Sequence, residues 1–189
     1  MDDIEFLFNN EEIYLCMIAE AMPENKTDYF YSSSDSLCVL NTLSAFQQAG
    51  FPAHSIAGIT RLGVYLTVAV KEPRPGTSMP RELIEKHNPA LEQELTQFPN
   101  LKVILLMGDV AITAFNLIAR RRTGKRCIPA GSTYKIRDQQ FFFEDLRVFP
   151  SYLQTGQNFL IEKAKQRMVA DDIRRAFAWL EQHPTHDHS

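Results

Sequence analysis

The chain has 189 residues, of which 44% are hydrophobic and 23% charged, and its formal net charge is −3. This length and composition predict one folded domain with a sizeable core, and they exclude the disordered and fibrous classes. No apolar run approaches the ~20 residues that cross a bilayer, and residues 1–5 are acidic, so we expect neither a membrane span nor a secretory leader.

The three cysteines, Cys16, Cys38 and Cys127, are far apart and form no C-x-x-C pair. An odd number of scattered cysteines is typical of free thiols in a reducing compartment. We therefore expect a cytoplasmic protein without disulfides.

Charge is unevenly distributed along the chain. Residues 1–100 carry 6 Lys/Arg and 14 Asp/Glu, whereas residues 101–189 carry 14 and 9. One stretch holds basic residues and no acidic ones, namely Arg120, Arg121, Arg122, Lys125, Arg126, Lys135 and Arg137. Such a run is usually a solvated face. The alternative is a footprint for a phosphate backbone, because clustered Lys and Arg release the counterions that DNA condenses.

Hydrophobic patterning predicts alternating strands and helices. Residues 13–19 are a continuous apolar run, which predicts a strand buried on both faces. Helical spacing and a following glycine predict a helix over residues 36–49. Residues 64–70 predict a second buried strand, and a proline-initiated helix follows over about 80–98. Residues 101–107 predict a third strand.

The second half continues this alternation. A Gly-Asp turn leads into a helix over residues 109–122, and residues 133–136 and 141–143 predict a hairpin. A short strand over residues 147–149 then precedes a long amphipathic helix over residues 158–182.

This order predicts an α/β fold, a three-layer α/β/α sandwich with a mostly parallel, about four-stranded central sheet. We expect a single domain over residues 1–182 and a polar tail over residues 183–189. The tail holds three histidines without the packed surroundings of a metal cage, so no metal is expected. Ligands of such sheets bind beyond the carboxyl ends of the strands. The segments at those ends are residues 19–31, 67–76, 107–109 and 149–158.

Two of these segments carry candidate functional residues. Glu20 directly follows the first predicted strand and precedes the aromatic pair Phe30 and Tyr31. A carboxylate there could orient a water, and an aromatic ring could stack on a flat ligand. The alternative is that Glu20 caps a helix or meets solvent while the aromatics belong to the core. Leu153 follows a proline turn among hydroxyl residues, which suits a wedge that fills the gap left by a flipped base, or else a contact to the final helix.

Taken in order, four segments resemble the uracil-DNA glycosylase superfamily, particularly its bacterial and archaeal iron–sulfur-type branch. Residues 19–23, Ala-Glu-Ala-Met-Pro, resemble that branch's Gly-Glu-Ala-Pro-Gly motif. Residues 65–71 resemble its Thr-Asn-x-Val-Lys strand, and residues 105–111 its strand–glycine–helix step. Residues 149–153, Phe-Pro-Ser-Tyr-Leu, resemble its His-Pro-Ser-Pro-Leu loop. The resemblance covers about residues 12–178 and implies that superfamily's fold, with DNA as partner.

The resemblance also implies roles for individual residues. Glu20 would position the attacking water and stabilise the positive sugar. The implied substrate-binding residues are Ala21, Phe30, Tyr31, Val68 and Phe149. The implied DNA contacts are Pro150, Ser151, Leu153, Arg120, Arg122, Lys125 and Arg126.

The sequence departs from the family pattern at its polar positions. Val68 stands where the family has the asparagine that reads the uracil edge, and Phe149 stands where it has its catalytic-loop histidine. Glu72 and His87 or Asn88 occupy cluster-cysteine positions, so no iron–sulfur cluster or other cofactor is expected. An apolar pocket discriminates between bases by only about 10²-fold, and losing one preorganised donor lowers a rate by about 10²–10³.

Three functions follow from these residues. The first is a DNA-glycosylase-type hydrolase that acts on a flipped uracil or other deaminated base with altered specificity. The second is a catalytically inactive binder of nucleic acid or nucleotide with the same fold. The third is a hydrolase of free nucleosides or nucleotides that uses the same pocket.

Overall fold

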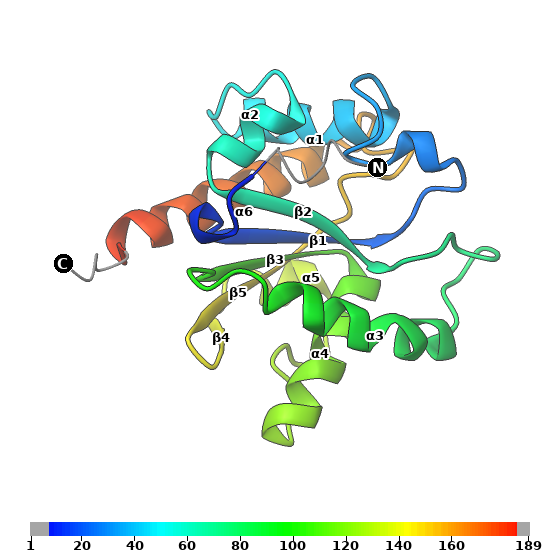
Figure 1. Ribbon diagram of the computed structural model, residues 1–189, viewed down its shortest axis with the longest axis vertical. Coiled ribbons are helices and arrows are strands. Elements are labelled where there is room, and N and C mark those ends of the chain that lie inside the picture. The colour runs from blue at the N-terminus through cyan, green and yellow to red at the C-terminus, as the bar shows by residue number, and fades with distance from the viewer. Residues whose placement is uncertain (1–7, 185–189) are drawn as a thin grey trace.

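The computed structural model describes residues 8–184 and is built around a five-stranded sheet (Figure 1). Its strands are β1 (Leu15–Ala21), β2 (Val64–Val70), β3 (Val103–Met107), β4 (Phe141–Phe143) and β5 (Leu146–Ser151). They lie in the order β2-β1-β3-β5-β4. All neighbours are parallel except β4, which pairs antiparallel with β5. The α/β class and the mostly parallel sheet are therefore confirmed, with one strand more than predicted.

The central strands owe their sequences to burial on both faces. Every residue of β3 is buried, and so are the first five residues of β1. A strand covered on both sides has no solvent-facing position, which explains the continuous apolar runs in place of alternation. β1 extends past the predicted end, so Glu20 belongs to the strand itself.

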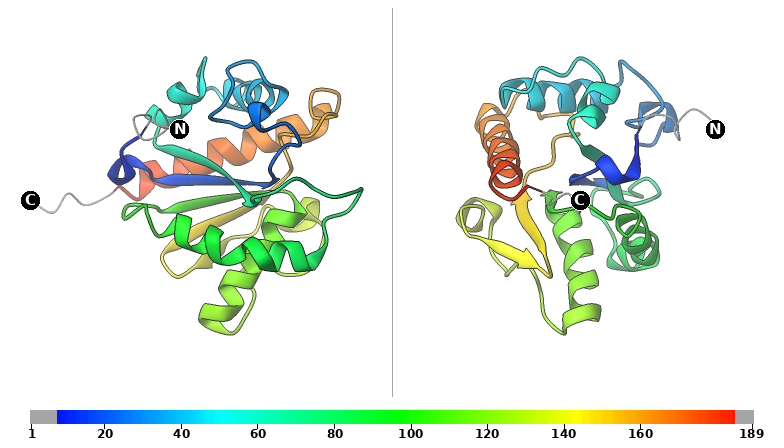
Figure 2. Two further views of the ribbon diagram at one scale, coloured as in Figure 1. Left: turned by 45° about the vertical axis from the view of Figure 1, so that its right-hand side comes forward. Right: turned by 60° about the vertical axis from the view of Figure 1, so that its left-hand side comes forward.

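Helices cover both faces of the sheet (Figures 1 and 2). α1 (Leu37–Gln48), α2 (Ile56–Arg61) and α6 (Lys163–Gln182) enclose one hydrophobic cluster against the sheet. α3 (Arg81–Leu95) and α4 (Asp109–Thr123) enclose a second cluster on the other face. The short helix α5 (Thr133–Ile136) packs beside β5.

The predicted hairpin between residues 133–136 and 141–143 is wrong. Residues 133–136 form α5, which buries Thr133 and Ile136 on one side and leaves Tyr134 71% exposed. β4 pairs instead with β5, the strand that follows it directly, through a tight turn in which Glu144 has a φ of 52°. Local pairing across this turn brings β4 to the edge of the sheet.

Other boundaries differ less. α6 begins at Lys163, because residues 158–161 form turns, and α2 is a helix that the sequence pattern does not predict. Within residues 8–184 no helix combines the length and the apolar character that a bilayer crossing requires. Cys16, Cys38 and Cys127 are free thiols. Residues 1–5 and most of the predicted polar tail lie outside the described residues.

Candidate functional site

The candidate site lies at the carboxyl ends of β1 and β3. The chain passes from β1 to β2 on one side and then returns across β1 to β3 on the other. In open α/β sheets, ligands bind in the crevice where the strand order reverses in this way. A pocket of about 510 Å³ opens at this end of the sheet, lined by residues of β1, β2 and the loops after β1, β2 and β5, among them Glu20, Tyr29, Val68, Arg74 and Leu153.

Glu20 is held in one orientation by three neighbours. Its side chain is 12% exposed and forms an ion pair with Arg74. Its Oε1 atom lies 3.5 Å from the backbone N of Val110, in the first turn of α4, where free N–H groups carry positive partial charge. Gly108 permits this approach, because a Cβ atom there would lie 2.6 Å from Oε1. The structure therefore presents a fixed carboxylate at the sheet edge.

Arg74 is a site residue outside the set predicted from the sequence. It comes from the loop after β2 and places its guanidinium against Glu20 at the pocket wall. A guanidinium is always charged and offers several N–H donors in a fixed fork. The sequence feature that points to Arg74 is its position in a loop directly after a predicted strand.

The aromatic ring in the pocket is Tyr29, and the predicted pair Phe30 and Tyr31 faces elsewhere. Phe30 is 1% exposed and packs in the core, and Tyr31 donates its hydroxyl hydrogen to the carbonyl of Leu66. Phe30 and Tyr31 line a separate, smaller pocket. Burial raises the pKa of Tyr29 above its ordinary value, so its phenol is neutral near pH 7.

One wall of the pocket is apolar. Ala21 and Val68 line it from adjacent strands, and Val68 offers no hydrogen bond to a ligand. Cys38 of α1 also faces this pocket. Burial raises the pKa of its thiol to about 12, so Cys38 is protonated near pH 7 and is no nucleophile.

Leu153 reaches the pocket from the loop after β5, far from Glu20 in the sequence. The loop is fixed to α1 by Asn41, whose side-chain amide donates to the carbonyl of Gly156 at 3.1 Å. The end of β5, before this loop, is interior. Phe149 and Pro150 are buried in β5, and Ser151 is 0% exposed.

The predicted role of Ser151 as a phosphate contact does not agree with its position. Its hydroxyl donates to Asp172 Oδ2 at 2.6 Å, inside the protein. Asp172 is itself 0% exposed and forms ion pairs with Arg137 and Arg175. This network joins β5 to α6 and leaves no Ser151 atom for a ligand.

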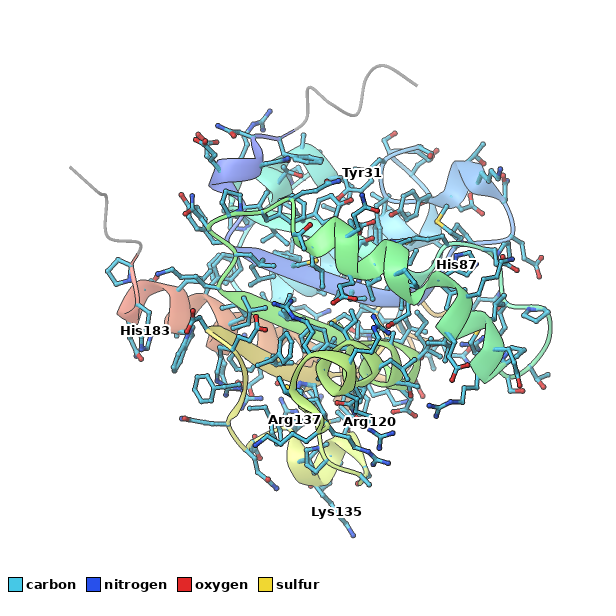
Figure 3. The ribbon with its side chains drawn as sticks, turned by 60° about the horizontal axis from the view of Figure 1, so that its bottom comes forward. Tyr31, His87, Arg120, Lys135, Arg137 and His183 are labelled. Atoms are coloured by element: carbon cyan, nitrogen blue, oxygen red, sulfur yellow. The ribbon has the colours of Figure 1, made fainter. Side chains whose placement is uncertain are left out.

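The predicted basic residues Arg120, Arg122, Lys125 and Arg126 lie at the far end of α4 and in the loop after it. Arg122 forms an ion pair with Glu144 at 2.7 Å. Arg120 and Arg126 line a second pocket of about 330 Å³. In Figure 3, Arg120 lies on the opposite side of the molecule from Tyr31.

Between residues 8 and 184, no three His, Cys, Asp or Glu side chains gather closely enough to hold a metal ion. Fold and site together define an α/β protein with a fixed carboxylate at the switch point of a mostly parallel sheet. No protein-family model matches the sequence, and no curated protein matches it.

Proposed function

We propose that this protein hydrolyses the N-glycosidic bond of a uracil or other deaminated base flipped out of DNA, on a fold of the uracil-DNA glycosylase type. One observation carries the proposal. Glu20 of the first parallel strand and Leu153 of the loop after the last parallel strand line one pocket at the carboxyl ends of those strands. A carboxylate for the sugar and an aliphatic side chain for the gap left by the flipped base are two groups that such an enzyme needs, and Leu153 is half-buried at the pocket wall.

Glu20 supplies the chemistry at the sugar. Breaking an N-glycosidic bond leaves positive charge on the sugar ring, which a nearby carboxylate stabilises. The same carboxylate orients a water for attack. Arg74 and the first turn of α4 hold Glu20 in place, so little reorganisation is needed during the reaction.

Arg74 supplies the chemistry at the departing base. The base leaves with negative charge, and Val68 and Phe149 have no donors to stabilise it. Arg74 is the one cationic side chain among the described residues that line the pocket. We assign to Arg74 the stabilisation of the leaving base, for which one donor contributes about 10²–10³ in rate.

The test is base release from synthetic oligonucleotides. Single-stranded and duplex DNA containing uracil, hypoxanthine or xanthine is incubated with the protein, and abasic sites are cleaved by alkali. We expect release of at least one base, a loss of about 10²–10³ in Glu20→Gln, and wild-type activity in the control Glu181→Gln, an exposed carboxylate of α6 outside this pocket. Leu153→Ala lowers release from duplex and spares single-stranded DNA, because a wedge acts only on a stacked partner. Failure to release any base, with no DNA affinity at low salt, contradicts the proposal.

A second function is favoured by the Glu20–Arg74 ion pair, which satisfies the carboxylate within the protein. In that case the protein binds nucleic acid without cleaving it. DNA affinity that falls steeply with salt, with no base release and no effect of Glu20→Gln, identifies this function. Activity on free nucleosides and none on DNA identifies a nucleoside hydrolase.

A further inference from the structure

The second pocket is a basic groove along α4, which we call the α4 groove. Its lining includes Arg81, Asp109, Thr113, Asn116, Arg120 and Arg126. We infer that the α4 groove binds the backbone phosphates of the nucleic-acid strand whose base enters the Glu20 pocket. The identity of the strand rests on the proposed function. The binding of phosphates rests on the charge and shape of the groove itself.

Two of the three arginines that line the groove are available to a ligand, whereas Arg81 forms an ion pair with Glu85 at 2.8 Å. Neighbouring Arg121 and Arg122 form ion pairs with Glu92 at 2.6 Å and Glu144 at 2.7 Å. Arg120 and Arg126 have no ion-pair partner within residues 8–184. Cations in the last turn of a helix also complement its dipole. That effect accounts for Arg120 but not for Arg126, which lies beyond the end of α4 at Thr123.

The far wall of the groove is fixed before any ligand arrives. The side chain of Asn116 accepts hydrogen bonds from the backbone N–H groups of Cys127 at 3.0 Å and Ile128 at 2.9 Å. It also donates to the carbonyl of Ile128 at 2.9 Å. These three bonds tie the loop that carries Arg126 to the middle of α4. An ordered wall of this kind lowers the entropy that a ligand would otherwise lose on binding.

The length of the groove favours a chain of phosphates over a single one. Asp109 begins α4 and Arg120 lies in its last turn, so about 16 Å of helix separates the two ends. A nucleic-acid strand carries one charge per ~3.4 Å of axis, so several phosphates fit this length. A single phosphate at Arg120 would leave most of this length unfilled.

One end of the groove lies beside the candidate site along the chain. Asp109 follows Gly108, the residue against which Glu20 packs. On the other side of the Glu20 pocket, the β1–α1 loop presents Glu24 and Asp28, which repel phosphate. That loop holds one cation, Lys26, between the two acids, whereas the α4 groove holds three arginines and one acid, Asp109. A strand that leaves the pocket is therefore attracted to the α4 side.

The test compares two pairs of arginines by fluorescence anisotropy with a labelled, undamaged single-stranded oligonucleotide over a range of salt concentrations. Arg120→Gln/Arg126→Gln removes two groove cations. Arg61→Gln/Arg167→Gln is the matched control, since these exposed residues lie on α2 and α6 across the sheet. We expect the groove pair to reduce the slope of log affinity against log salt by about 1.4, at ~0.7 per lost phosphate contact. The control pair leaves the slope unchanged, and Arg120→Lys/Arg126→Lys preserves most of it.

Equal slopes for the groove and control pairs would overturn the inference. So would inorganic phosphate or a mononucleotide binding as tightly as the oligonucleotide, since that result assigns the groove to a small anion. The readout is independent of base release. If the protein releases a base but the slopes do not change, the proposed function stands and phosphate binding by the α4 groove is refuted. If the slopes change but no base is released, phosphate binding by the groove stands and the enzymatic function is refuted.

Discussion

Replacing Gly108 by alanine perturbs the position of Glu20 without touching its charge. Gly108 has φ 105° and ψ 170°, a region essentially restricted to glycine, and a side chain there costs about 1–3 kcal/mol. The added Cβ would lie 2.6 Å from Glu20 Oε1 and 3.2 Å from its Cδ. Ordinary contact requires about 3.5 Å, so the carboxylate must move by roughly 1 Å. A displacement of that size lowers the rate of a positioned reaction by about 10²-fold.

Two measurements check this prediction, urea unfolding and single-turnover base release. Gly50→Ala is the control, because Gly50 has a φ of 89° and nothing within 4 Å of an added Cβ. We expect Gly50→Ala to lose about 1–2 kcal/mol of unfolding free energy and no activity. We expect Gly108→Ala to lose at least as much stability, together with most of its base release.

A double-mutant cycle tests the contact whether or not the protein is an enzyme. In Glu20→Ala the clashing atoms are absent, so Gly108→Ala should then cost only its backbone strain. The reasoning from close approach would be refuted if Gly108→Ala lost the same unfolding free energy in the wild-type and the Glu20→Ala backgrounds. It would also be refuted if Gly108→Ala were as stable and as active as wild type.

Two further predictions concern buried groups. Asp172→Asn should lower the unfolding free energy by about 3–5 kcal/mol, because it leaves two arginines without their buried partner. The control is Asp171→Asn at the half-exposed neighbouring residue, which should lower the unfolding free energy by at most about 1 kcal/mol. Equal losses for the two variants in urea titrations would contradict the assignment. Cys38, with a pKa of about 12, should react with iodoacetamide at pH 8 at least about 100-fold more slowly than a free cysteine of pKa ~8.5, and faster as pH rises. Peptide mass spectrometry measures this rate, and rapid alkylation at pH 8 would mean that the thiol is not buried as described.

The strands that the sequence predicts best are those whose burial leaves no ambiguity. The run over residues 64–70 coincides with β2, because a seven-residue apolar segment next to a glycine fits a strand and is too short for a typical helix. Residues 133–136 offer no such length. Thr133 and Ile136 share one face only once the backbone is helical, and what they pack against is decided by tertiary contacts.

The candidate site shows the same limit. Glu20 ends a buried strand and Leu153 follows one, so the parallel sheet itself brings them to a common edge. Which aromatic ring joins them depends on the path of the loop between β1 and α1, where a short 3₁₀ turn at Lys26–Asp28 directs Tyr29 to the pocket. No periodicity encodes that path, nor the position of Arg74 in its proline-flanked loop.

Tyr31 does not line the Glu20 pocket, but it protects an edge of the sheet from pairing with another copy of the protein. Its hydroxyl both donates to the carbonyl of Leu66 at 2.8 Å and accepts from the N–H of Leu66 at 2.9 Å. β2 is the outermost strand on that side, and unpaired peptide groups on such a strand are a template for a foreign strand. The phenol occupies the middle of that template, and the opposite border, β4, is only three residues long. Both borders of the sheet thus resist edge-to-edge polymerisation by strand addition.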